Sequence, residues 1–214
     1  MNPSENTKGP EILKWDCKRF PGKGVESTEV PLESPSSRYR YWIERSWNDN
    51  PDFILWIMFN PSHATIKCNR TISGRDGAVP ICFGRSQRIA HYQDLSVGGM
   101  RIVNLFARRA TDIHASEWPK GKPYDHPLWD AWIGPGDLNH IRDQAKAAKR
   151  VIAAWGFDKV KNEGAKWWAD SIEAELSDLW CLRHPAGKSH PYYAGPQGKP
   201  PIDADIIRLE DARR

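Results

Sequence analysis

The feature that most restricts how this chain can fold is a set of four short, mainly apolar segments, each followed by turn or polar residues. Runs of this length, bounded by turn residues, are typical of strands buried on both faces of a parallel sheet. The four segments are Asp52 to Phe59, Arg101 to Phe106, Val151 to Ala154 and Leu179 to Leu182. We therefore expect four parallel strands at the centre of the fold.

Segments with helical spacing of apolar residues lie between or after these strands. We expect helices over 85–97, 137–150, 164–177 and 202–213, with Asp137 as an N-cap, and an edge strand over 38–47. Residues 63–84 read as a long loop and 111–136 as a connection rich in Trp and Pro. Alternating strands and helices predict an α/β fold with three α/β/α layers around a mainly parallel four-stranded sheet.

The length of 214 residues suits one domain with an extension. Residues 1–35 contain five prolines and little periodicity, so we expect a loosely structured N-terminal arm. Residues 36–214 are expected to form a single α/β domain.

The apolar runs, the N-terminus and the cysteine spacing exclude several classes of protein. The longest apolar run has seven residues, Phe53 to Phe59, whereas a membrane-spanning helix needs about 20. The first ten residues are polar and contain no apolar core of a secretory signal, so we expect a cytoplasmic protein. The four cysteines, at 17, 68, 82 and 181, form no CxxC pair, so we expect reduced thiols, no metal and no cofactor.

Basic residues are concentrated in one part of the chain. Residues 60–110 contain eight lysines and arginines against Asp76 and Asp94, which gives this segment a charge of +6. The whole chain carries +4, so the remainder sums to −2. Seven of the eight basic residues are arginine, which binds phosphate with a forked pair of donors. This excess fits a polyanionic ligand, and a solvated basic face is an equally good reading.

Polar residues follow each of the four predicted strands. In parallel sheets ligands bind beyond the carboxyl ends of the strands, so these residues are expected to converge on one crevice. They are Asn60-Pro61-Ser62, then Asn104 with Arg108 and Arg109, then Trp155-Gly156, and finally His184-Pro185 with His190-Pro191.

A first resemblance covers about residues 38–195. It rests on FNPSHA (59–64), NRTI (69–72), RIVNLFARRATD (101–112), GPGDLN (134–139), AWG (154–156) and the HPYY ending at 193. This order is similar to a family of uncharacterised bacterial and phage proteins with the pattern LNPSTAD, DPT, NLFAxRAT, GPxND, AWG and HPLY. The chain departs from that pattern at His63, which replaces Thr, and at Asn69-Arg70, which replaces Asp-Pro.

A second, more distant resemblance concerns function. The uracil-DNA glycosylase superfamily has a G-x-[DN]-P motif after its first strand, and Asn60-Pro61 is similar. Asn104 is similar to its base-reading Asn, Ala154-Trp155-Gly156 to its LWG, and His184-Pro185 to its His-Pro-Ser motif. The resemblance implies excision of a base from DNA by hydrolysis of the N-glycosidic bond. A bulky modified pyrimidine of phage DNA is a candidate target, which implies a repair or anti-phage enzyme.

The resemblance implies roles for several residues. Asn60 would orient the attacking water, since an amide cannot accept its proton as a carboxylate does, and Asp76 or Asp112 could supply a carboxylate. His184 and His190 are equal candidates for the donor to the leaving base, and His63 could act as acid, base or phosphate contact. Asn60 and Asn104 also suit turns, and the histidines could be exposed loop residues.

Base recognition and phosphate contacts complete the expected site. Asn104 would read the edge of a flipped base, with Phe59, Trp155, Tyr192 and Tyr193 as stacking candidates, although single aromatics are more often core residues. The candidate phosphate contacts are Ser62, Arg108, Arg109 and Lys188. The expected partner is double-stranded or locally opened DNA, bound by a monomer.

Two other functions remain open from the sequence. Asn60 in place of a carboxylate favours a non-catalytic module that binds a modified base or nucleotide. A nuclease would need clustered carboxylates to bind metal. Asp76 and Asp94 are the only acids of the basic segment, so a nuclease is the least favoured of the three functions.

Overall fold

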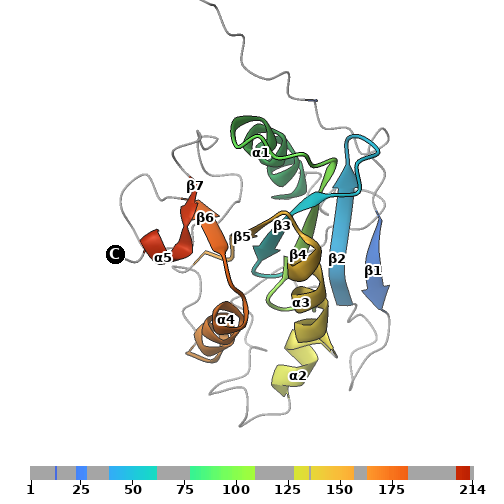
Figure 1. Ribbon diagram of the computed structural model, residues 1–214. Coiled ribbons are helices and arrows are strands. Elements are labelled where there is room, and N and C mark those ends of the chain that lie inside the picture. Colours follow the sequence, from blue (N-terminus) through green and yellow to red (C-terminus); the bar gives the residue numbers. More distant parts are fainter. Residues whose placement is uncertain are drawn as a thin grey trace, which may run out of the picture.

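The computed structural model describes residues 13, 23–27, 39–61, 78–108, 128–134, 136–156, 163–182 and 206–212. Its strands are β1 (Lys23–Ser27), β2 (Tyr39–Ser46), β3 (Phe53–Met58), β4 (Gly99–Asn104), β5 (Arg150–Ala153), β6 (Leu179–Leu182) and β7 (Ile206–Arg208). Its helices are α1 (Ala78–Tyr92), α2 (Leu128–Ile133), α3 (Asp137–Ala147), α4 (Glu163–Glu175) and α5 (Leu209–Ala212). The chain therefore has a mixed α/β fold, as the alternation of segments predicted (Figure 1).

The strands form one sheet. Strands β2 to β7 lie in the order β2-β4-β3-β5-β6-β7, and β1 extends the sheet to seven strands beside β2. The four central strands β4, β3, β5 and β6 are parallel to one another, and these are the four strands that the apolar runs predicted. Strands β2 and β7 pair antiparallel with the two sides of this centre, and β1 pairs antiparallel with β2, so the prediction of a four-stranded sheet is wrong in its size.

Strand β3 is buried along its whole length because both of its faces are covered. Its residues alternate between two apolar clusters, as the two-residue period of a strand requires. Ile54, Trp56 and Met58 pack with residues of α1. Leu55 and Ile57 pack instead with residues of α3 and α4. Helices thus lie on both faces of the sheet, with α1 on one and α2, α3 and α4 on the other (Figure 1).

Tertiary pairing explains where the predicted elements differ from the observed ones. The segment 38–47 is not at an edge, because β1 pairs outside β2. The helix expected over 202–213 is wrong for residues 206–208, which instead form β7 along the free edge of β6. Ile206 is buried in this position, so packing outweighs the local helical spacing.

Helix α1 begins inside the segment that was expected to be a loop. Its third residue is Pro80, which was read as a loop signal. Proline is accepted in the first turn of a helix because the N–H groups there have no partner within the helix. Helix α2 lies in the segment expected to be an irregular connection, and the helices predicted at 137–150 and 164–177 are confirmed as α3 and α4 with shorter ends.

Ser86 gives a direct test of the packing of α1 on β3. The indole Nε1 of Trp56 donates a hydrogen bond of 2.8 Å to Ser86 Oγ, and both side chains are fully buried. Ser86→Ala should lower the free energy of unfolding by about 1–3 kcal/mol, because it leaves a buried donor unsatisfied. Urea unfolding would measure the change.

The matched control is Ser171→Ala in α4. Ser171 Oγ donates to the carbonyl of Trp167 in the same helix, at a half-buried position. A change within about 0.5 kcal/mol is expected for the control. Equal losses in the two variants would contradict the assignment of Ser86 as the specific partner of Trp56.

Candidate functional site at the carboxyl edge of the sheet

The carboxyl ends of four strands meet at one edge because β4, β3, β5 and β6 are parallel. Asn104, the last residue of β4, is paired in register with Met58, the last residue of β3. The N–H of Leu105 continues this pairing by donating to the carbonyl of Met58 at 2.8 Å, and Ala154 N–H donates to the carbonyl of Ile57 at 2.8 Å. The polar residues expected after β3 and β4 therefore begin side by side.

The connections that follow β3 and β5 diverge at this edge. The chain leaves β3 through α1 on one face of the sheet and leaves β5 through α4 on the other face. Adjacent parallel strands whose connections diverge in this way form a topological switch point, where α/β proteins bind ligands. Asn60 follows β3 and Gly156 follows β5, so these two residues border the switch point between the two strands.

Asn104 is the most unusual residue at this edge. Its side chain is 1% exposed, and neither Oδ1 nor Nδ2 has a hydrogen-bond partner among the described residues. On the same face, the last residue of the adjacent strand β3 is Met58 and the residue after β5 is Ala154, and both are apolar. A buried polar group without partners costs about 1–3 kcal/mol, which is unusual in a native protein. An amide kept in this state is suited to a ligand that offers one acceptor and one donor.

Asn60 lies where the sequence predicted, directly beyond β3. It is half-buried, and the following Pro61 is buried. The preceding residue is tied to the neighbouring strand, because the N–H of Phe106 donates to the carbonyl of Phe59 at 3.1 Å. The turn at Asn60 is therefore anchored beside the end of β4. Its role in orienting water stays a prediction.

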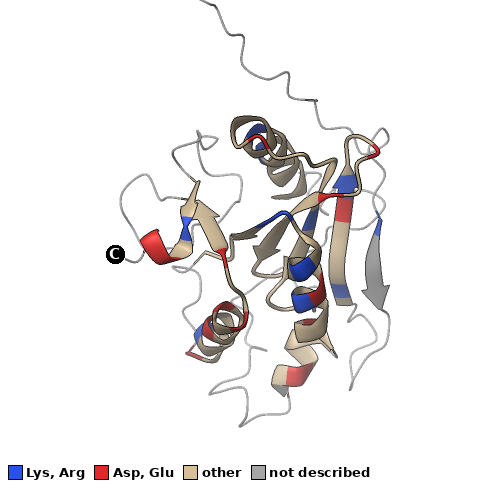
Figure 2. Cartoon of the chain, in the orientation of Figure 1, with Lys and Arg blue, Asp and Glu red and all other residues tan. Residues whose placement is uncertain are grey.

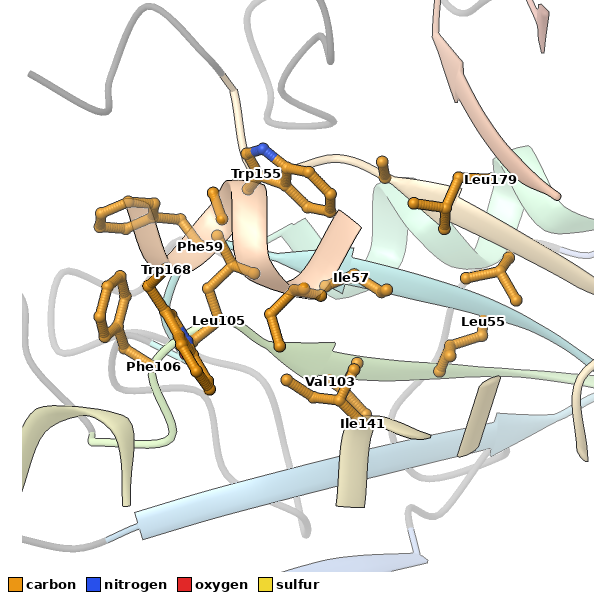
Figure 3. Packing of buried hydrophobic residues seen from close by; sticks show 14 of the residues in the cluster. Leu55, Ile57, Phe59, Val103, Leu105, Phe106, Ile141, Trp155, Trp168 and Leu179 are labelled. Carbon is orange, nitrogen blue, oxygen red and sulfur yellow. The ribbon is translucent and has the colours of Figure 1, made fainter. Parts of the chain in front are cut away.

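Two stacking candidates are core residues in this structure. Phe59 is 4% exposed and Trp155 is 1% exposed. Both belong to the cluster on the α4 face, where the Phe59 ring lies 5.2 Å from that of Phe106 (Figure 3). Asn104 is on the opposite face of β4, by alternation from Val103 and Leu105 of this cluster. The two rings therefore support the strand ends from the far face, and base stacking on them stays a prediction.

Arg108 lies beyond the end of β4 and is half-buried. Its guanidinium carbon is 4.5 Å from the centre of the Trp132 ring, and its backbone bridges to Tyr39. Burial raises the pKa of the Tyr39 phenol, and the nearby positive charge of Arg108 opposes this shift. Stacking on Trp132 fixes the guanidinium near the carboxyl edge, which is compatible with the predicted phosphate contact.

The basic excess of residues 60–110 does not form one exposed face in the described residues. Arg85 is 2% exposed, inside the contact of α1 with the sheet. Arg101 is paired with Glu44 and bonded to Gln144 at 2.6 Å, above the Phe53 ring. Figure 2 shows the described lysines and arginines spread over several helices and strands. Part of the basic excess is therefore structural.

The remaining predicted site residues lie outside the described residues. They are the histidines His63, His184 and His190, the phosphate candidates Ser62, Arg109 and Lys188, the tyrosines Tyr192 and Tyr193, and the carboxylates Asp76 and Asp112. The part of the chain that the structure describes contains no group of three or more metal-binding side chains. Within the same part, no helix combines the length and apolar character needed to cross a membrane.

Asp137 is a residue whose importance the sequence reading missed. It was predicted to cap α3, but the N-cap is Gly136, with φ of 71°, and Asp137 is the first helical residue. Its carboxyl is 1% exposed, and neither oxygen has a hydrogen-bond partner among the described residues. Burial raises its pKa well above the usual range of an aspartate. The GPGDLN segment around it, noted for its resemblance, was the available signal.

The family of the chain is shown by its sequence. A family described as "Protein of unknown function (DUF1643)" matches residues 40–192. The match covers well over half of the 214 residues, so the chain belongs to the DUF1643 family. The matched range contains all four parallel strands together with Asn60, Asn104 and Asp137. None of the curated proteins matches the sequence.

One solved structure is similar over part of its length. It is an aminopeptidase from the marine sediment archaeon Thaumarchaeota archaeon, with 13% identity and a TM-score of 0.30. The similarity covers 74% of this chain and 25% of the aminopeptidase chain. A TM-score at this level carries no argument about fold or activity.

The cost of the buried Asn104 amide can be measured directly. Asn104→Leu should raise the free energy of unfolding by about 1 kcal/mol, because it replaces an unpartnered polar group with an apolar one of similar size. Its control is Met58→Leu, at the residue of β3 that is paired with Asn104. This variant should lower the free energy of unfolding by less than about 1.5 kcal/mol. A loss of stability in Asn104→Leu larger than that of the control would mean that the amide has a partner in the folded protein.

The raised pKa of the Asp137 carboxyl should make the free energy of unfolding depend on pH. Below the pKa of an unfolded aspartate, about 3.9, the group is protonated in both states. As the pH rises from there toward the raised folded pKa, the unfolded chain releases the proton that the folded chain holds, so folding loses stability. Asp137→Asn does not titrate and should be stabilised relative to wild type more at pH 7 than at pH 3.5.

The control for this comparison is Asp143→Asn, at an exposed position of the same helix. It removes a carboxylate from the surface of the same helix, so its change in the free energy of unfolding is the background against which Asp137→Asn is compared. Urea unfolding of the three proteins gives the comparison. An Asp137→Asn difference that is equal at the two pH values would contradict a buried, neutral carboxyl.

Proposed function

We propose that this protein is a DNA glycosylase that hydrolyses the N-glycosidic bond of a modified or damaged base and leaves an abasic site. The observation that carries the proposal is the buried Asn104 amide at the carboxyl edge of β4, which has no partner among the described residues. Its position beside the end of β3 and the Asn60 turn agrees with the resemblance to the uracil-DNA glycosylase superfamily.

An amide is suited to reading a base because it presents one acceptor and one pair of donors in a plane. The edge of a flipped base offers the complementary groups. A bound base would give Asn104 the hydrogen bonds that it lacks in the described part of the chain. The free energy of those hydrogen bonds would favour binding. The apolar side chains of Met58 and Ala154, on the same face at the strand ends, would exclude water around that contact.

The chemistry requires a water at the sugar carbon and stabilisation of charge on the departing base. Asn60, at the switch point beyond β3, would hold the water in line with the bond. Arg108 would contact a phosphate, and the histidine that donates to the base remains His184 or His190. The proposal needs no metal or cofactor. The same proposal includes a three-layer fold like that of the uracil-DNA glycosylase superfamily. It also includes DNA as the partner and a monomeric protein.

A base-release assay tests the proposal. The protein is incubated in chelator with duplexes that carry uracil, normal bases or modified pyrimidines, and with intact DNA of phages that modify their bases. Alkali cleavage and mass spectrometry report abasic sites and free bases. Release of one base is expected, with Asn104→Ala reducing the rate by about 100-fold or more, the scale on which a single charge-stabilising donor acts.

The control is Asn139→Ala, the same change at an exposed position of α3, which should leave the rate unchanged. Activity of Asn104→Ala equal to wild type would remove Asn104 from the site. Absence of base release from every DNA would contradict the glycosylase.

A second candidate function is a reader that binds a modified base without cleaving it. It is favoured by the amide at Asn60, which cannot accept a proton from water. Salt-sensitive binding to one modified DNA without base release would identify it.

A further inference from the structure

Two buried polar side chains of the described residues share a property that the others lack. Six polar or charged residues are buried there: Arg40, Arg45, Arg85, Ser86, Asn104 and Asp137. Among these, Asn104 and Asp137 have no hydrogen-bond partner for any side-chain oxygen or nitrogen within the described part of the chain. The proposed function uses Asn104 and leaves Asp137 without a role.

The direction of α3 places Asp137 at the carboxyl edge of the sheet. Helix α3 ends at Ala147, and the N–H of Lys149 donates to the carbonyl of Phe53, the first residue of β3, at 3.0 Å. The end of α3 is therefore at the amino edge. Eleven helical residues span about 16 Å, and α3 packs on β2, β4 and β3, so its first residue reaches the opposite edge.

Hydrogen bonds connect the start of α3 to the end of β4. The N–H of Ala107 donates to the carbonyl of Ile133 at 3.0 Å, and the N–H of Arg108 donates to the carbonyl of Trp132 at 3.2 Å. Gly134 continues this contact, since a Cβ there would lie 3.0 Å from that of Ala107. Asp137 N–H then donates to the carbonyl of Gly134 at 3.2 Å. Asp137 thus follows a rigid turn fixed to the end of the strand that carries Asn104.

The two side chains reach this edge from opposite faces of the sheet. Asn104 faces the α1 side, and Asp137 begins the helix that covers the other side. A buried carboxyl with no hydrogen bond lowers the stability of the fold, and the helix cap does not use it. Such a group at the ligand-binding edge of a parallel sheet is suited to proton transfer.

We propose that Asp137 is the general acid and base of this protein's glycosidic hydrolysis, and that it supplies the carboxyl group that the first motif lacks at Asn60. The inference rests on the proposed function. It makes Asp137 a catalytic residue that contacts the flipped nucleotide at the edge of the sheet, with Asn104 holding the base.

The proton transfers balance in two steps. The bond between C1′ and the base nitrogen breaks, its electron pair stays with the base, and the Asp137 carboxyl gives its proton to that base. The histidine of the proposed site, His184 or His190, donates only a hydrogen bond to the departing base. Water then adds to C1′ and loses a proton to the Asp137 carboxylate. The products are a free neutral base and an abasic sugar, and the carboxyl returns to its protonated form.

Single-turnover base release and DNA binding test this role together. The substrate is the modified DNA that wild type cleaves in the base-release assay, and binding is measured with the same DNA carrying a 2′-fluoro, uncleavable nucleotide. Asp137→Asn keeps the size and a donor but has no transferable proton. It should lower the single-turnover rate by about 100-fold to 10,000-fold and leave binding within about threefold of wild type.

Two further variants separate catalysis from folding. Asp137→Leu should retain the fold, shown by an unfolding midpoint at or above that of wild type, and should also lose the rate. Asp143→Asn, exposed on the same helix, should match wild type in rate and in binding.

The outcomes distinguish the two proposals. An active wild type with Asp137→Asn also active within threefold would overturn the role of Asp137 and leave the glycosylase intact. Equal loss of binding and rate in Asp137→Asn would also overturn it, because the residue would then act in binding or structure. A wild type that releases no base from any DNA would overturn the proposed function and the inference with it.

Discussion

The structure depends on the burial of β3 between two neighbouring strands and two layers of helices. All six of its residues are buried, and it pairs in parallel with β4 on one side and β5 on the other. Its register runs without a break from Phe53–Gly99 to Met58–Asn104 against β4 and from Ile54–Arg150 to Ile57–Ala153 against β5. The position of its last residue, Met58, therefore fixes the positions of Asn60 beyond it and Asn104 beside it.

This rigid centre supports polar groups that do not contribute to stability. Asn104 and Asp137 are each 1% exposed, and their side chains have no partner among the described residues. Native proteins satisfy nearly all buried polar atoms, and exceptions concentrate where a ligand completes the hydrogen bonds. Asn104 and Asp137 both lie at the edge where parallel strands end and where the connections from β3 and β5 diverge to opposite faces. This arrangement is what the proposed function requires of a site formed before the ligand binds.

The sequence predicted the central strands well because burial on both faces leaves an unbroken apolar run. The segment 179–182 agrees at both ends with β6, and 52–59 extends one residue beyond β3 at each end. Elements that depend on long-range pairing were not visible locally. Residues 206–208 form a strand only because the edge of β6 is available to them, and Pro80 lies in a helix because the first turn accepts it.

The candidate site was predictable only in part. The position of Asn104 follows from its place at the end of an apolar run, but its burial without a partner depends on what surrounds it in three dimensions. Asp137 was read as a helix cap because Asp is common there, whereas the left-handed Gly136 takes the cap position and leaves the carboxyl in the interior. Phe59 and Trp155 were expected to stack on a base, but both lie in the core. The sequence does not separate these roles, because an aromatic residue at a strand end can equally complete the core.

The most direct test of the account is a crystal structure of the protein bound to a duplex that carries an uncleavable 2′-fluoro modified pyrimidine. The account predicts a flipped base at the carboxyl edge, with Asn104 Oδ1 and Nδ2 each within about 3.2 Å of a polar atom on the base edge. DNA bound elsewhere, or a base at this edge with the Asn104 amide still unpartnered, would contradict the central claim that this amide is kept for base recognition.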